Sequence, residues 1–311
     1  MHDNHIAIDC KGIIMRVAII GDGAMGTLFG ALLSQGNEVS VLSRSAERSA
    51  ARNERGITVQ GRLYHPRFIT DPCDAADPDL VIIFVKSADT ESALENARPL
   101  LSGHSLLLTL QNGAGHERIM ERFVPRGRIV IGKTEQNSTL VDGCTVLQGN
   151  PEGMTVLSPG GEDLVDAFAA SSLPCAVSED ISRIVWRKLL TNSSLSAATG
   201  VLGSTIGFLG KSKGAMSLVR ALLDEALSIA EADGYAFDRD EERRRIAGQC
   251  MRAGEARTSI ERDLALGRKT EADFITGYVV RKADELGIAA PVQHAVLSIL
   301  HAREDQNGSG R

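Results

Sequence analysis

The sequence predicts an α/β domain followed by an all-helical domain. In the first half, short runs that are apolar on both faces alternate with helical stretches. This is the order of right-handed βαβ units around a parallel sheet. After Pro174 the strand-like runs stop, and only helical periodicity remains. A chain of 311 residues is long enough for two domains of ordinary size.

Four runs are predicted to form strands of a parallel sheet, and those at 15–21, 79–86 and 104–113 are apolar on both faces, as is typical of buried strands. These runs are "MRVAIIG" at 15–21, "EVSVLSR" at 38–44, "DLVIIFVK" at 79–86 and "HSLLLTLQNG" at 104–113. An apolar helix connects the first two. From about 127 to 160 the sequence is strand-like and punctuated by glycine, without a helix of convincing length.

The second half is predicted to contain helices only. The helix around Lys188 is expected to begin at a capping serine, Ser178, and to end at Gly200. Two acidic residues in its first turn favour that start. Amphipathic or helix-like stretches follow at 215–234, 238–255, 271–287 and 291–304. The last of them begins with a proline, which suits a first helical turn.

Composition excludes several classes of protein. The net charge is -6, and the basic residues are dispersed, which argues against a nucleic-acid surface. The five cysteines are far apart and odd in number, so we expect a reduced, cytoplasmic setting. No apolar run is long enough to span a bilayer, and the N-terminus does not have the pattern of a signal peptide. The histidines lack the spacing of metal ligands, so no metal is expected.

A glycine-rich turn follows the first predicted strand. "GDGAMG" at 21–26 matches G-x-G-x-x-G between a strand and a helix, the context that makes this motif diagnostic of a Rossmann-type domain. The first glycine permits a tight turn, the second lets a pyrophosphate approach, and the third lets helix and strand pack closely. The alternative is a structural turn without a ligand. The predicted cofactor-binding residues of the turn are Gly21, Asp22, Gly23, Ala24, Met25 and Gly26.

The end of the second strand indicates which dinucleotide binds. NAD-binding domains place an acidic residue there, whereas this chain has "LSRSAER". Arg44 can pair with a 2′-phosphate in forked fashion, and Ser43 and Ser45 can add hydrogen bonds. The sequence therefore favours NADP (NADPH). The alternative is that Arg44 is a solvated loop arginine.

Two more predicted strands end in polar residues. Lys86 follows "FV", and Asn112 lies in "LQNG". Ligands bind beyond the carboxyl ends of the strands in open α/β sheets, so both are expected near the dinucleotide. Either could instead be an ordinary turn residue, since Asn-Gly is a common turn pair.

The helix at "WRKLLTNSS" turns from apolar to polar along one face. The apolar positions Ile181, Ile184 and Val185 continue into Lys188 and Asn192, with Ser196 one turn further. An ammonium can polarise and then protonate the oxygen of a carbonyl that accepts hydride. The amide of Asn192 would hold the substrate beside it. The alternative is a lysine that reaches water from the edge of the helix.

These motifs together resemble the ketopantoate reductase (2-dehydropantoate 2-reductase) family. "WRKLLTN" at 186–192 is similar to the family's W-x-K-L-x-x-N helix. "TSIERDLALGRKTEADFITGYVV" at 258–280 is similar to its second signature. The glycine turn, "VK" at 85–86 and "QNGAG" at 111–115 occur in family order. The resemblance covers the chain from about Met15 to His301.

The resemblance implies roles for residues of the catalytic side. Lys188 matches the family's general acid, and Asn192 its substrate-orienting asparagine. Ser259 falls where a serine binds the substrate carboxylate. Glu271 falls where a glutamate bridges the substrate hydroxyl and the nicotinamide ribose.

On the cofactor side, Asn112 and Lys86 match residues at the junction of cofactor and substrate, and Arg44 matches the 2′-phosphate contact. The implied reaction is the NADPH-dependent reduction of a 2-oxo acid, 2-dehydropantoate in pantothenate biosynthesis. One departure lies on the substrate side. Ser196 stands where the family has an asparagine, and it is shorter.

The predicted domains are an NADP-binding Rossmann-type domain over 15–178 and a helical substrate and catalytic domain over 179–303. Residues 1–14 are expected to be a disordered extension, and 304–311 a disordered tail.

Alternatives to the reductase remain at this point. One is an NAD(P)-dependent decarboxylating 3-hydroxy acid dehydrogenase, although that family has a glycine where this chain has Val185. The other is a non-catalytic NADP-sensing protein. The expected partner is a small-molecule 2-oxo acid, without nucleic acid or membrane. The apolar faces of the C-terminal helices could pack within one chain or across a homodimer.

Overall fold

The computed structural model describes residues 15–75, 77–101 and 103–308. The chain divides into two compact units. The first runs up to Gln111 and from Glu117 to Ile181, and the second comprises Asn112–His116 and the chain from Ser182. The short segment Asn112–His116 thus packs with the helical unit, although its neighbours on both sides belong to the first. The predicted extension at 1–14 lies outside the described residues.

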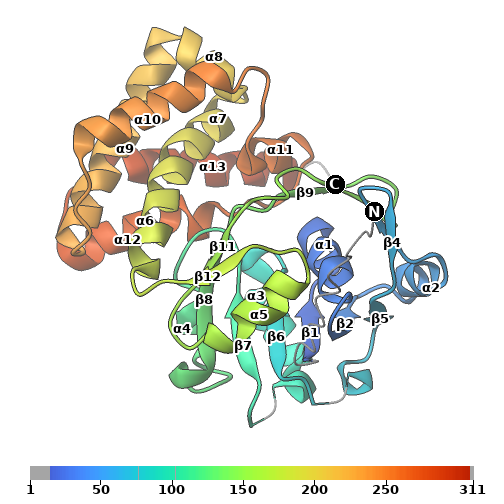
Figure 1. The fold of residues 1–311 in the computed structure, drawn as a ribbon. Coiled ribbons are helices and arrows are strands. Elements are labelled where there is room, and N and C mark those ends of the chain that lie inside the picture. Colours follow the sequence, from blue (N-terminus) through green and yellow to red (C-terminus); the bar gives the residue numbers. More distant parts are fainter. Residues whose placement is uncertain (1–14, 76, 102, 309–311) are drawn as a thin grey trace, which may run out of the picture. The chain divides into compact units, whose positions relative to one another are not determined.

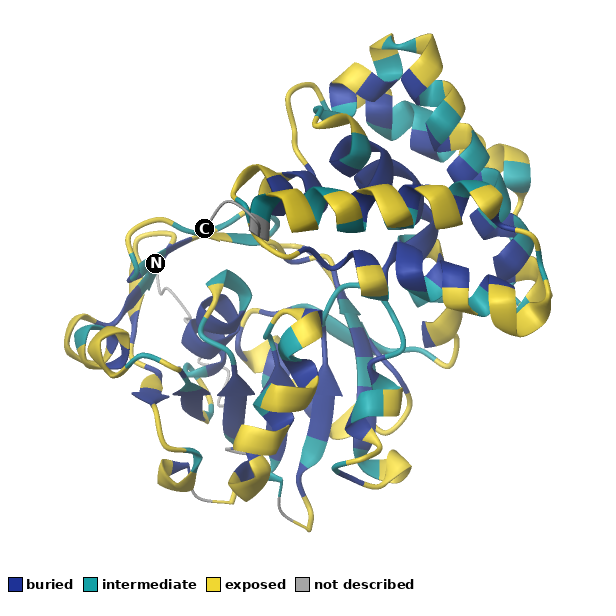
Figure 2. Cartoon of the chain, turned by 180° about the vertical axis from the view of Figure 1, so that it is seen from behind, coloured by how far each residue is buried: buried dark blue, intermediate teal, exposed yellow. Residues whose placement is uncertain are grey.

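The first unit is built on a mixed eight-stranded sheet with the order β12-β11-β8-β7-β6-β1-β2-β5. From β8 through β5 neighbouring strands are parallel, and β11 pairs antiparallel with β8. The predicted parallel strands of the first half are confirmed. Figure 2 shows the central strands as buried. The strands are β1 (Arg16–Ile20), β2 (Glu38–Leu42), β5 (Arg67–Ile69), β6 (Leu80–Ile83), β7 (Leu106–Thr109), β8 (Ile129–Thr134), β11 (Thr155–Leu157) and β12 (Cys175–Val177).

Helices and short turns connect these strands. The helices are α1 (Ala24–Leu33), α2 (Ala46–Arg55), α3 (Thr90–Asn96), α4 (Glu117–Met120) and α5 (Glu162–Ala170). The 3₁₀ turns are η1 (Pro72–Asp74), η2 (Ser87–Asp89), η3 (Arg98–Leu100) and η4 (Arg126–Arg128). Helix α1 is buried from its third residue to its end, as expected for a helix enclosed between layers.

A second, four-stranded sheet packs over α1 in the same unit. Its order is β4-β3-β10-β9, with β3 (Ile57–Val59), β4 (Arg62–Tyr64), β9 (Ser138–Leu140) and β10 (Thr145–Gln148). The strand-like region from 127 to 160 therefore contributes strands to both sheets. The hairpin β3–β4 was not predicted. It turns at Gln60 and Gly61, both with positive φ, which is the conformation of a tight two-residue hairpin turn.

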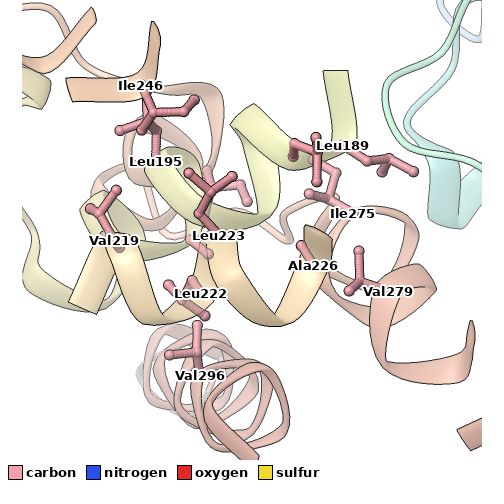
Figure 3. Close-up of a cluster of buried hydrophobic side chains, with 14 of the residues drawn as sticks. Leu189, Leu195, Val219, Leu222, Leu223, Ala226, Ile246, Ile275, Val279 and Val296 are labelled. Atoms are coloured by element: carbon pink, nitrogen blue, oxygen red, sulfur yellow. The ribbon is translucent and has the colours of Figure 1, made fainter. Parts of the chain in front are cut away.

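The second unit is all-helical, as predicted. Helix α9 packs against α8, α10, α12 and α13. Figure 3 shows its buried side chains Val219, Leu222 and Leu223 within the hydrophobic cluster of this unit. The helices are α6 (Ile181–Thr191), the π-helical segment η5 (Asn192–Ser196), α7 (Ala197–Leu202), α8 (Ile206–Lys211), α9 (Lys213–Ala232), α10 (Arg239–Arg252), α11 (Ser259–Ala265), the 3₁₀ turn η6 (Ala272–Phe274), α12 (Thr276–Leu286) and α13 (Pro291–Gly308).

Both predicted ends of the Lys188 helix are wrong. The helix begins at Ile181. Ser178 is not its N-cap but lies in the turn before it, where its hydroxyl accepts a hydrogen bond from the Asp180 amide. Gly200 does not end the helix but lies inside α7, and Gly203 ends it in the left-handed conformation. A Cβ at Gly200 would lie 2.6 Å from Ile260 and 2.8 Å from Leu300, so this glycine serves close helix packing.

The predicted tail at 304–311 is also wrong over its first part, because α13 continues to Gly308. The Glu304 carboxylate accepts hydrogen bonds from the Thr270 amide at 2.9 Å and from its hydroxyl at 2.6 Å. The side chain of Asn307 donates to the Leu264 carbonyl at 2.9 Å. These polar side chains hold the last helical turns to the rest of the unit. Residues 309–311 lie outside the described part.

Candidate active site

The three glycines of the turn after β1 have three different surroundings. Gly21 has a φ of +111°, and a Cβ there would lie 2.9 Å from the Phe84 backbone. A Cβ at Gly26 would lie 1.9 Å from the Gly21 carbonyl oxygen. Gly23 is exposed, and nothing lies within 4 Å of the position of its missing Cβ. A side chain would clash with the backbone at Gly21 and Gly26, whereas the space at Gly23 is accessible. This is the arrangement that the approach of a dinucleotide to the backbone requires.

The start of α1 also fits a pyrophosphate. Its N-cap is Gly23, which offers no side chain to the first N–H groups, and the first turn contains no acidic residue. These N–H groups and the helix dipole favour an anion. Ala24 and Met25 begin the helix, and the Met25 sulfur accepts a hydrogen bond from the Ser138 hydroxyl of the small sheet.

The residues after β2 only partly match the expectation. Arg44 is 90% exposed, and its guanidinium lies 3.9 Å from the Asp89 carboxylate. The Ser43 hydroxyl is buried and donates to the Asp22 carboxylate at 2.8 Å, so it is already engaged within the protein. Ser45 caps α2 by accepting a hydrogen bond from the Arg48 amide.

Asp22 is the centre of a cluster that the sequence did not reveal. Its carboxylate accepts hydrogen bonds from Arg48 Nε at 3.1 Å and Arg52 Nη1 at 3.0 Å, besides that from Ser43. The Arg52 side chain is 2% exposed, and burial lowers the pKa of its guanidinium, partly offset by Asp22. Arg48 and Arg52 are one helical turn apart, which places them on one face of α2, but nothing in the sequence paired them with the glycine turn.

The turn after β6 is fixed from the neighbouring strand. Gln111, just beyond β7, donates from Nε2 to the Val85 carbonyl and to the Thr90 hydroxyl, both at 2.9 Å. Lys86 follows as an exposed residue at the start of η2. The ends of β6 and β7 are thereby tied together at the edge where a ligand of such a sheet binds.

Lys188 is half-buried on α6, and the two residues before it anchor the helix. The indole of Trp186 donates to the Asp233 carboxylate at 2.9 Å. Arg187 Nε donates at 3.0 Å to Glu242, whose side chain is 2% exposed. Arg245 donates to the other oxygen of Glu242 at 2.7 Å. Since successive helical residues point in different directions, these two anchors fix the rotation of α6 and hence the direction of Lys188.

The helix changes its geometry one turn after the lysine. Asn192–Ser196 is π-helical, and the Ala197 amide donates to the Asn192 carbonyl five residues earlier. The sequence predicts a regular helix with Ser196 one turn beyond Asn192. The wider turn alters that alignment. Asn192 is half-buried and Ser196 is buried. Single π-helical turns of this kind are frequent at functional sites.

The segment Asn112–His116 is held on η6 and brings Asn112 to Glu271. Asn112 Nδ2 donates to Glu271 Oε2 at 3.2 Å, and Glu271 is buried. The Ala114 amide donates to the Phe274 carbonyl at 2.9 Å. A Cβ at Gly113 would lie 2.2 Å from that carbonyl oxygen, so only glycine allows this close approach.

His116 completes this attachment. Its ring stacks on Phe274 with 4.7 Å between ring centroids and an interplanar angle of 15°. Burial lowers the pKa of His116 to about 4, and the nearby Arg281 acts in the same direction. The ring is therefore neutral near pH 7 and contributes to packing.

Ser259 is the first residue of α11 and is half-buried. Its neighbour Thr258 caps the helix, and the Thr258 hydroxyl lies 2.7 Å from that of Thr199 on α7. Segment η5 packs against both α11 and α12. The predicted residues of the catalytic side, Asn112, Lys188, Asn192, Ser196, Ser259 and Glu271, thus all belong to the second unit.

Within the residues that the structure describes, no group of three His, Cys, Asp or Glu side chains could hold a metal ion. In the same part of the chain, none of the helices has the length and apolar character needed to cross a membrane.

The glycine turn on a parallel sheet, together with an anchored lysine helix in a second unit, is typical of an oxidoreductase with a dinucleotide cofactor. The family comparisons agree. The family model described as "Ketopantoate reductase PanE/ApbA" matches residues 17–161, and its C-terminal counterpart matches residues 180–304. The chain belongs to the ketopantoate reductase family, so the resemblance found in the sequence is confirmed.

Individual relatives are similar over nearly their whole length. A 2-dehydropantoate 2-reductase of Streptococcus pyogenes serotype M6 is 28% identical over 301 residues, which are 93% of this chain and 98% of that protein. One of Halobacterium salinarum is 30% identical over 292 residues, 89% of this chain and 95% of that protein. The ternary structure of D-mandelate dehydrogenase with NADH and anilino(oxo)acetate has a TM-score of 0.86 and 28% identity, and the match covers 94% of this chain and 100% of that one.

Proposed function

We propose that this protein reduces a 2-oxo acid to a 2-hydroxy acid with NADPH as the preferred cofactor. The hydrogen bond between Asn112 and Glu271 is the observation that carries the proposal. It joins a residue that follows a strand of the Rossmann-type sheet to a buried carboxylate in the family's second signature. The family match and the open glycine turn support the same conclusion.

Each predicted residue has a distinct task in this proposal. The Lys188 ammonium polarises the C2 carbonyl oxygen and delivers the proton to it. Ser259 and Asn192 hold the substrate, with the buried Ser196 beside them. Glu271 accepts hydrogen bonds from the substrate hydroxyl and the nicotinamide ribose, and Asn112 orients its carboxylate. The bound NADPH supplies the hydride.

The cofactor-side residues bind the dinucleotide along its length. Gly21, Gly23 and Gly26, with the backbone of Asp22, Ala24 and Met25, surround the pyrophosphate. Arg44 pairs with the 2′-phosphate, and Ser43 acts through Asp22. Lys86 lies toward the nicotinamide end. The proposal includes a cytoplasmic location, based on the dispersed cysteines, and a role in pantothenate biosynthesis.

The first candidate substrate is 2-dehydropantoate, because it is the substrate of the curated relatives named above. An aryl-substituted 2-oxo acid is the second candidate. It is favoured by the similarity to D-mandelate dehydrogenase and by Ser196, which is shorter than the asparagine of the family.

The test is a cofactor-oxidation screen of the purified protein against a panel of 2-oxo acids that includes 2-dehydropantoate and benzoylformate. NADPH and NADH are compared for each. The proposal predicts turnover of at least one 2-oxo acid, with a 2-hydroxy acid as the product and NADPH preferred. Binding of the cofactor without turnover of any panel member, or release of CO₂, would contradict it.

A further inference from the structure

The acidic residue that the second strand lacks is supplied by the glycine turn. Ser43 follows β2 directly, and its hydroxyl donates to Asp22 at 2.8 Å. A carboxylate therefore stands at the tip of β2 even though no acid occurs there in the sequence. This is the position from which an acid binds the ribose 2′-hydroxyl in NAD-binding domains.

The carboxylate is held by two arginines that differ in exposure. Arg52 is 2% exposed and also donates to the Gly143 carbonyl at 2.8 Å and to the Asp22 carbonyl at 3.0 Å. Its guanidinium also lies 5.0 Å from the Phe68 ring centroid, so it is fixed from several sides. Arg48 is 53% exposed and reaches only the Asp22 carboxylate with its Nε and Nη2. Of these two arginines, Arg48 is the one that can turn toward a ligand.

Arg48 also lies in the first turn of α2, four residues after the exposed Arg44. Arg44 and Arg48 lie on either side of Ser45, the N-cap of α2, and two guanidinium groups in this short segment suit the 2′-phosphate of NADP, which carries up to two negative charges. The same phosphate would be repelled by an unpaired Asp22. Arg52 remains to neutralise Asp22 when Arg48 is withdrawn.

We propose that Asp22 and Arg48 form an exchangeable ion pair that lets this protein bind both NADPH and NADH. With NADPH, Arg48 leaves Asp22 and binds the 2′-phosphate together with Arg44. With NADH, Arg48 stays on Asp22, which accepts a hydrogen bond from the ribose 2′-hydroxyl. This inference rests on the proposed function and adds the selection of the cofactor to it.

The experiment measures the dissociation constants of NADPH and NADH by fluorescence titration, without substrate. Arg48→Gln is expected to weaken NADPH by about 10- to 100-fold, the effect of losing a charge-assisted hydrogen bond, and to change NADH less than about 3-fold. Asp22→Asn is expected to weaken NADH by about 10-fold and to leave NADPH as tight or tighter. Arg55→Gln and Glu54→Gln change exposed residues of the same helix and serve as matched controls.

An equal effect of each variant on the two cofactors would overturn the inference. If Asp22→Asn does not fold, the inference is tested with Arg48→Gln and Arg48→Lys. The ratio of their NADPH and NADH dissociation constants is compared with that of the unmodified protein. Binding of both cofactors with an unchanged ratio overturns the ion-pair exchange and leaves the proposed function standing. Binding of neither cofactor to the unmodified protein overturns the proposed function itself.

Discussion

The side-chain amide of Asn112 donates a 3.2 Å hydrogen bond to the carboxylate of Glu271, 159 residues away in the sequence. The bond lies within one compact unit, because the segment Asn112–His116 leaves the sheet unit and packs on η6. It therefore joins the segment that follows β7 in the sequence to the signature that contains Glu271, within the helical unit.

Removal of this bond is the first prediction. Asn112→Ala leaves the buried carboxylate without that donor, so we expect kcat/KM to fall by about 10- to 100-fold. Asn112→Asp places two carboxylates together and should reduce it further. Glu271→Gln retains the contact with Asn112 but loses the negative charge. It therefore separates the contribution of the hydrogen bond from that of the charge. Steady-state kinetics on the best substrate of the screen measures the effects. An Asn112→Asp variant as active as the original protein would remove Asn112 from the site.

The second prediction concerns Arg44. Its side chain is 90% exposed and only 3.9 Å from Asp89, so it contributes little to folding. Arg44→Asp should weaken NADPH relative to NADH, because it exchanges a cation for an anion beside the 2′-phosphate. Thermal unfolding of the variant checks that the fold is retained. An unaltered ratio of the two dissociation constants would exclude Arg44 from the cofactor site.

The third prediction concerns the anchor of α6. Glu242 is buried between Arg187 and Arg245, and Glu242→Gln removes the carboxylate that both guanidinium groups share, leaving Arg187 only its exposed partner Glu241. Removing one partner of a buried ion pair costs about 3 to 5 kcal/mol, although the partly exposed Arg187 places this case at the lower end. Chemical denaturation should show this loss. Glu241→Gln, on the same helix, removes an exposed carboxylate and should cost less than about 1 kcal/mol. Similar losses in the two variants would contradict the anchoring role.

The fourth prediction is a pH dependence of stability due to His116. Because the pKa of the buried ring is lowered from 6.5 to about 4, the unfolded chain binds a proton between these values and the folded chain does not. His116 therefore makes the free energy of unfolding decrease as the pH falls from about 6.5 to about 4, by about 3 kcal/mol. His116→Phe retains the stacking on Phe274 and should reduce this slope. An unchanged slope in that variant would place the titration elsewhere.

Local signals predicted much of the fold. Runs that are apolar on both faces located β1, β6 and β7, the strand-like run after the first helix located β2, and the glycine spacing located the turn before α1. These features depend on neighbours in the sequence. The family resemblance likewise rested on short motifs, and the comparisons confirm it.

Contacts between distant segments were not predictable in the same way. Gly200 resembles a helix end in the sequence, but Ile260 and Leu300 require a glycine inside the helix. Residues 304–308 are polar like a frayed tail, yet Thr270 and Leu264 bind their side chains. The pairing of Asp22 with Arg48 and Arg52 was missed for the same reason, since the partners lie on different elements.

The central claim is that Lys188 is the proton donor of the reaction. The most direct test measures kcat and NADPH affinity for Lys188→Ala, with Lys211→Ala, an exposed lysine of α8, as the control. The account predicts that kcat falls by about 10²- to 10⁴-fold in Lys188→Ala while the dissociation constant of NADPH stays within about 3-fold of its original value. Undiminished turnover by Lys188→Ala would contradict it.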